Sequence, residues 1–106
     1  MRPLALIVEY EVHPGCEAEF EALMLTHARA CLVEEPGCLR FEILRPVDDE
    51  GRPIPHRLLA NELFRDSAAL VAHRATARWQ ALAQRFPELL ANRRPTTCEV
   101  QSNAGA

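Results

Sequence analysis

The hydrophobic and polar positions along the chain change period several times, and each period indicates one kind of element. Residues 4–12 (LALIVEYEV) alternate Leu6, Val8 and Tyr10 with residues of the opposite face, a period of two that is typical of a β-strand. Apolar residues then recur three or four positions apart, which predicts an amphipathic helix. The positions in this helical stripe are Phe20, Leu23, Met24, His27 and Cys31.

The helix that contains this stripe is predicted to stop at Pro36. Proline has no amide proton to donate, and it pushes Glu35 out of the helical region of backbone conformations. Gly37 tolerates the positive φ that a tight reversal can require. Pro36 and Gly37 together therefore indicate a turn directly before the next element.

Two further strands follow, joined by a hairpin. Residues 38–47 (CLRFEILRPV) alternate apolar with mostly polar side chains, and residues 56–64 (HRLLANELF) read as a third strand. The segment between them, 48–53 (DDEGRP), is polar and contains a glycine, as a hairpin loop requires. The alternation in the second strand predicts that one of its faces carries Leu39, Phe41 and Ile43.

The remaining third of the chain predicts a second helix and a last strand. Residues 65–86 have a helical pattern, with Asp66 or Ser67 as the N-cap and a break near Thr76. Residues 94–102 are rich enough in β-forming residues for a fourth strand.

The element order β-α-β-β-α-β predicts a ferredoxin-like α+β fold, a four-stranded antiparallel sheet with both helices on one face. We expect a single domain over residues 1–106, with a core at about 3–100 and a frayed tail at 101–106. Strands that are apolar on both sides, with Ile7 beside Val8, predict that a second subunit covers the other face. The expected assembly is a homodimer, a dimeric α+β barrel.

Composition and charge narrow the possible functions. The 106 residues are 48% hydrophobic and 25% charged, with a formal net charge of −3 and arginines spread along the chain, so no basic stripe is available for nucleic acid. No run approaches the ~20 apolar residues of a membrane helix. Because two glutamates interrupt the first apolar segment, a signal peptide is not expected, and we predict a cytoplasmic protein without membrane contact. The four cysteines form no C-x-x-C pair and are expected to be free thiols.

Candidate chemistry lies in the two helical stripes, which point into the space between helices and sheet. His27 and Cys31 are one turn apart on the first helix, and His73 lies in the stripe of the second. An imidazole there can remove a proton from a phenol or an enolisable carbonyl, with Glu62 to orient it. The same four residues could also complete a set of metal ligands. A chain with four histidines and four cysteines generates such a set easily by chance, so we expect no metal.

Two segments, EEPGCLRFEIL at 34–44 and ANELFRDSAALVAHRATARW at 60–79, resemble the antibiotic biosynthesis monooxygenase (ABM) domain family, together with the element order. The resemblance extends from about Pro3 to Val100. It implies a ferredoxin-like subunit that pairs sheet to sheet into a dimer. Members of the family include quinol monooxygenases, monooxygenases that form polyketide quinones and an enzyme that processes the phosphorylated autoinducer-2 signal.

The resemblance also implies site residues. Glu62 falls on the family's strand glutamate and His73 on its helix histidine, and with His27 they are the expected catalytic residues. The residues expected to bind substrate are Cys31, Phe41, Arg78 and Trp79. This chain departs from the family pattern in having Phe64 for a Tyr or Trp, Arg78 for a second histidine and His27 for an asparagine. Ala83 stands near the position of the axial histidine of the haem-degrading branch, so haem is not expected.

The function expected from these residues is a cofactor-independent monooxygenase that oxidises a small quinol or polyphenolic substrate with dioxygen. A base removes the phenolic proton, and the electron-rich anion reduces dioxygen directly. His73, with Glu62 as its carboxylate partner, is favoured over His27 as that base. Two alternatives stay open: an isomerase of a small phosphorylated hydroxy-dione, and a non-catalytic dimer that binds a metabolite.

Overall fold

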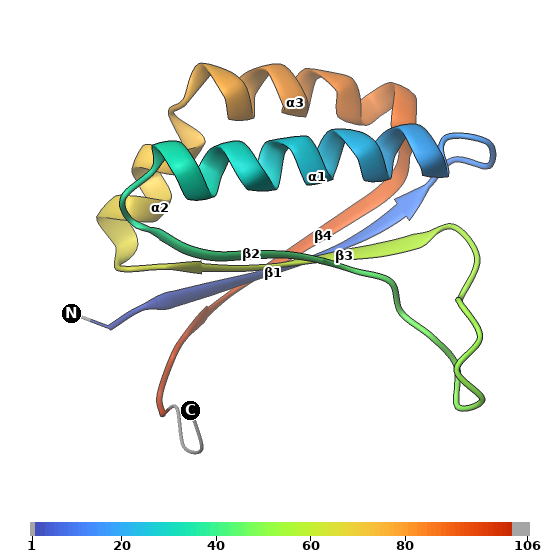
Figure 1. Cartoon of the computed structure of the whole chain (residues 1–106), viewed down its shortest axis with the longest axis horizontal. Coiled ribbons are helices and arrows are strands. Elements are labelled where there is room, and N and C mark those ends of the chain that lie inside the picture. Colours follow the sequence, from blue (N-terminus) through green and yellow to red (C-terminus); the bar gives the residue numbers. More distant parts are fainter. Residues whose placement is uncertain (1, 103–106) are drawn as a thin grey trace.

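The structure is a computed structural model that describes residues 2–102, and it has the ferredoxin-like α+β fold that the sequence predicts. The frayed tail expected at 101–106 lies mostly outside the described residues. Four strands and three helices follow one another along the chain (Figure 1). They are β1 (Leu4–Val12), α1 (Glu17–Glu34), β2 (Cys38–Leu44), β3 (Arg57–Phe64), α2 (Ser67–Arg74), α3 (Ala77–Leu89) and β4 (Leu90–Glu99).

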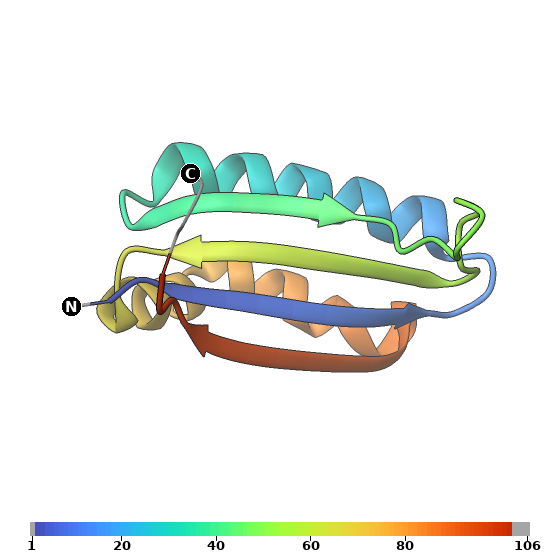
Figure 2. The same ribbon diagram turned by 90° about the horizontal axis from the view of Figure 1, so that it is seen from below.

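The strands form one antiparallel sheet in the order β2-β3-β1-β4, and all three helices lie on the same face of it (Figures 1 and 2). The period-two pattern of β1 directs Leu6, Val8 and Tyr10 toward the helices, where all three are buried. Phe20 and Met24 of α1 pack against this face. The core, and any enclosed site, therefore lies between the sheet and the helices.

The predicted break in the second helix is confirmed, because the segment forms two helices, α2 and α3. The Asp66 side chain accepts a hydrogen bond from the backbone N–H of Ala69 and caps α2. Thr76 caps α3 through a bond from the N–H of Trp79. Capping residues thus fix where each helix begins.

The expected ends of α3 and β4 were wrong. Pro87 does not end the helix but lies within its last turn, and β4 begins at Leu90 rather than at residue 94. Pairing with β1, which starts where Val12 faces Leu90, makes the strand longer than its polar sequence suggests. Helix and strand therefore join without a loop.

The expected faces of β2 were wrong at one residue. The register between β2 and β3 shifts between Cys38 and Arg40, and the shift leaves Leu39 half exposed while Phe41 stays buried. Gly37 also differs from expectation, because its φ is not positive. A Cβ at this position would lie 2.4 Å from the Cβ of Ala69, so glycine is needed for close approach to α2.

The face of the sheet opposite the helices is bare in the described chain (Figure 2). Apolar side chains are exposed there, with Ile7 at 39% and Leu44 at 44% exposure. The homodimer that would cover this face stays a prediction. Within residues 2–102, no helix has both the length and the apolar character needed to span a membrane.

Candidate functional site

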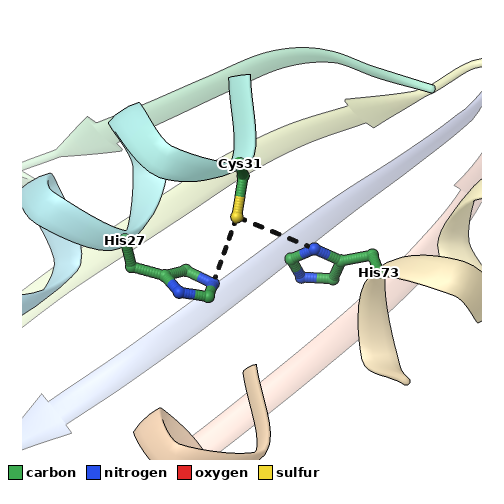
Figure 3. Close-up of side chains that lie close together, drawn as sticks. All are labelled: His27, Cys31 and His73. Atoms are coloured by element: carbon green, nitrogen blue, oxygen red, sulfur yellow. Dashed lines mark hydrogen bonds between the residues drawn. The ribbon is translucent and has the colours of Figure 1, made fainter. Parts of the chain in front are cut away.

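A histidine-cysteine-histidine cluster lies between the helices and the sheet (Figure 3). Sγ of Cys31 is 3.4 Å from Nε2 of His27 and 3.8 Å from Nδ1 of His73. The exposed fractions of the three residues are 5% for His27, 0% for Cys31 and 1% for His73. The structure thus brings together three predicted site residues, two of them expected from the sequence to be catalytic and one expected to bind substrate.

Helix geometry explains why these residues meet. His27 and Cys31 are four positions apart on α1, so both point from the same side of the helix toward the sheet. His73 lies in the last turn of α2, whose start is fixed by the Asp66 cap. The short helix approaches α1 across the tight turn at Gly37, which places the imidazole of His73 beside the thiol.

The hydrogen-bond partner of His73 is Glu35 and not Glu62. Nδ1 of His73 is 2.8 Å from Oε1 of Glu35, whereas its Nε2 is 3.8 Å from Oε1 of Glu62, too far for a hydrogen bond. The other oxygen of Glu35 accepts a hydrogen bond from the guanidinium of Arg78. Glu35 therefore bridges α2 and α3, and the expected partner Glu62 is a near neighbour without a bond to the imidazole.

Sequence reasoning missed Glu35 as a site residue. It follows the last residue of α1 in extended conformation, because Pro36 prevents a further helical turn. The side chain turns inward and reaches groups 38 and 43 positions later in the chain. A carboxylate directly before a Pro-Gly turn is the only local signal, and it does not identify the partners.

Burial determines the charge of the site. It lowers the pKa of His27 to about 4 and also lowers the pKa of His73, and it raises the pKa of Cys31 to about 12. Burial likewise raises the pKa of Glu62 to about 8. Burial alone would raise the pKa of Glu35, but the hydrogen bonds from His73 and Arg78 hold this pKa below the usual value. Near pH 7 the imidazoles and the thiol are consequently uncharged.

A cavity of about 570 Å³ that is open to solvent lies between α1 and α3, and His27 of the cluster is among its lining residues. Most of its wall is aliphatic, and Arg78 and Arg85 on α3 supply its cationic groups. The lining residues are Glu19, Ala22, Leu23, Thr26, His27, Ala30, Arg78, Ala81, Leu82 and Arg85. This volume suits a small-molecule ligand.

Only two of the seven predicted site residues, His27 and Arg78, line this cavity. His73, Glu62 and Cys31 lie behind it in the packed interior. Phe41 is also buried, with its ring centroid 5.6 Å from that of His27, so it supports the imidazole. Trp79 is half-buried and is not among the cavity residues.

Residues 3–85 match the family model described as antibiotic biosynthesis monooxygenase, which is most of the chain. The chain belongs to this family. The finding confirms the family resemblance of the two sequence segments, while it leaves the substrate unspecified. No curated protein matches the chain.

Solved structures with the same fold include several proteins from bacteria. PA3566 from Pseudomonas aeruginosa is 24% identical, with a TM-score of 0.80 over 96% of this chain and 97% of that one. Rv0793 from Mycobacterium tuberculosis is 21% identical, with a TM-score of 0.81 over 97% and 99%. A mutant of SnoaB, a cofactor-independent oxygenase from Streptomyces nogalater, is 19% identical, with a TM-score of 0.80 over all of both chains. At these identities the likeness concerns the fold.

Proposed function

We propose that this ABM-family protein is a cofactor-independent monooxygenase that oxidises a small quinol or polyphenolic substrate with dioxygen. The observation that carries the proposal is a buried imidazole, that of His27, at the wall of a largely aliphatic cavity. Family membership and the fold shared with SnoaB, a cofactor-independent oxygenase, support the same reaction class.

We assign the role of base to His27, although the sequence favoured His73. His73 does not line the cavity, and its two ring nitrogens lie beside the carboxyl groups of Glu35 and Glu62. Nδ1 of His27, by contrast, has no hydrogen-bond partner in the described part of the chain. When the ring proton sits on Nε2 and points to Cys31, Nδ1 has a free lone pair.

In the proposed reaction, His27 removes a phenolic proton and the quinol anion transfers one electron to dioxygen. The substrate radical and superoxide combine, which forms a C–O bond at a ring carbon, and the peroxide takes up a proton. Loss of the ring C–H proton and cleavage of the O–O bond then release water. Quinol and dioxygen thus give a hydroxyquinone and water, and all four electrons come from the substrate.

The residues behind His27 act as positioning residues in this proposal. Glu35 accepts hydrogen bonds from His73 and Arg78, and the His73 ring lies 5.6 Å from the His27 ring, centroid to centroid. Burial and the positive charge of Arg78 lower the pKa of His27, and the negative charge of Glu35 opposes them, so Glu35 offsets part of the cost of an imidazolium there. Arg78, at the cavity wall, can attract the phenolate that proton removal creates.

The homodimer predicted from the sequence is part of the proposal. Exposed Ile7 and Leu44 on the bare face of the sheet support it, because burial of such side chains against a second copy is favourable. The cavity lies on the other face, between α1 and α3, so each subunit would hold its own site.

An oxygen electrode and isotope labelling test the function. Chelator-treated protein is given hydroquinones, naphthohydroquinones and anthrones, with a protein-free blank to subtract autoxidation. We expect uptake of one dioxygen per product and incorporation of one labelled oxygen atom from ¹⁸O₂. His27→Ala should lower kcat by about 10²–10⁴-fold, which is the usual loss for a general base. His13→Ala, which removes a histidine outside the cavity lining, should leave kcat unchanged.

Other outcomes would refute this function. Anaerobic rearrangement of a phosphorylated hydroxy-dione without oxygen uptake would instead establish the isomerase alternative. Ligand binding without turnover of any of these compounds would identify a metabolite-binding module. If His27→Ala retained full oxygenase activity while His73→Ala lost it, the base would be His73, as the sequence suggested.

A further inference from the structure

We propose that His27, Cys31 and His73 form a buried binding site for a transition-metal ion of the zinc or copper(I) type. The three possible ligand atoms lie within 4.8 Å of one another and come from two helices (Figure 3). All three residues are buried, so water competes little for the ion. No other group of three or more such residues occurs among residues 2–102.

The distances fit coordination of a metal. Zinc binds thiolate sulfur at about 2.3 Å and imidazole nitrogen at about 2.0–2.1 Å, so sulfur and nitrogen ligands of a tetrahedral ion are about 3.6 Å apart. The two distances from Sγ of Cys31 are 3.4 Å to Nε2 of His27 and 3.8 Å to Nδ1 of His73. The two nitrogens lie within 4.8 Å of each other, and rotation of the imidazoles would adjust this separation.

The donor types select the ion. Thiolate and imidazole are ligands for zinc and copper(I), whereas magnesium and calcium prefer oxygen. Glu35 can supply a fourth donor, because its Oε1 is 2.8 Å from the nitrogen of His73 that would hold the metal. The thiolate, Glu35 and Arg78 sum to a charge of −1, which a cation offsets.

The unpartnered nitrogen of His27 is a second, independent observation. Nδ1 is buried and has no hydrogen-bond partner in the described residues, an arrangement that costs free energy. An imidazole held by a metal through Nε2 has its proton on Nδ1. Because no group among the described residues pairs with Nδ1, either nitrogen of His27 can carry the proton, and Nε2 is available to face a metal ion beside Cys31.

Metal binding and proton removal would exclude each other at His27, a consequence that rests on the proposed function. Coordination through Nε2 leaves the ring proton on Nδ1, and this removes the lone pair that accepts the substrate proton. Coordination through Nδ1 of His73 also replaces its hydrogen bond to Glu35. The metal-bound protein would be an inactive form of the enzyme.

Cobalt(II) provides a spectroscopic probe for this site. Chelator-treated full-length protein is titrated with Co²⁺ under reducing, anaerobic conditions, and we expect a thiolate-to-cobalt charge-transfer band that saturates at one ion per chain. Zn²⁺ should remove the band by displacement, and Mg²⁺ should not. Cys31→Ser should abolish the band, and His73→Ala should weaken the affinity at least about 100-fold.

Cys38→Ser is the matched control. Cys38 is also buried, but its Sγ contacts the carbonyl of Arg40 and it is not in the cluster. Its variant should keep the band and the stoichiometry, and far-UV circular dichroism checks that each variant is folded. Absence of the band in the parent, its persistence in Cys31→Ser or its loss in folded Cys38→Ser would overturn the proposal. None of these measurements depends on oxygen uptake. The metal site is therefore tested separately from the proposed oxygenase function.

Discussion

Replacement of Glu62 by glutamine should make the protein more resistant to alkaline destabilisation. Glu62 is 3% exposed, and its Oε1 has no hydrogen-bond partner among the described residues. Burial raises its pKa from 4.5 to about 8. The folded state therefore binds a proton that the unfolded state releases, and Glu62 costs stability as the pH rises from 4.5 toward 8.

The magnitude follows from this interval. Each pH unit between 4.5 and about 8 costs 1.36 kcal/mol, so the total is on the order of 5 kcal/mol. Above the folded-state pKa, Glu62 causes no further loss of stability, and its contribution to the free energy of unfolding no longer changes with pH. Glutamine has nearly the same shape and does not ionise. Glu62→Gln should consequently gain stability over the parent progressively across the interval and differ little from it near pH 4.5.

Urea unfolding at several pH values measures this effect, with fluorescence of the single tryptophan, Trp79, as the signal. Protein concentration is held constant, because dimerisation would contribute to stability. The informative quantity is the difference between parent and variant, since it cancels the titration of groups common to both. Asp49→Asn, which removes an exposed carboxylate from the loop between β2 and β3, is the control and should show no such trend. A difference that stays constant from pH 5 to pH 8 would refute the reasoning.

Three further predictions concern the scaffold. Gly37→Ala should destabilise the protein by about 1–3 kcal/mol in urea, and Ala69→Gly should partly rescue it, because the clash is between their Cβ positions; strictly additive effects would contradict this. Asp66→Ala should cost about 1 kcal/mol in thermal unfolding through loss of the α2 cap, while Ser67→Ala, beside it, should cost less. Ile7→Glu should convert the expected dimer to a monomer in equilibrium sedimentation, and a parent that is already monomeric at micromolar concentration would disprove the dimer.

Local chemistry predicted most of the fold. Alternation identified the strands, and Pro36 fixed the end of α1 because a proline effect does not depend on distant contacts. The break before α3 was similarly visible, since Thr76 caps the following helix through its own side chain. These features are settled within a few residues along the chain.

Features that depend on distant partners could not be predicted in this way. The bulge at Leu39 arises from the pairing of β2 with β3, and the polar first half of β4 is a strand because β1 lies beside it. In the candidate site, a family pattern identified His73 but gave it Glu62 as a partner. The partner is Glu35, whose position depends on how the chain turns after α1.

The direct junction of α3 and β4 limits how the cavity can open. Leu89 ends the helix and Leu90 begins the strand, and both are buried. One wall of the cavity is thus anchored to the sheet at its C-terminal end, whereas its other end follows the two-residue break at Ala75 and Thr76. Entry of a bulky ligand would therefore displace the N-terminal end of α3 more than its C-terminal end, and this displacement would have to break the ion pairs of Arg78 with Glu34 and Glu35.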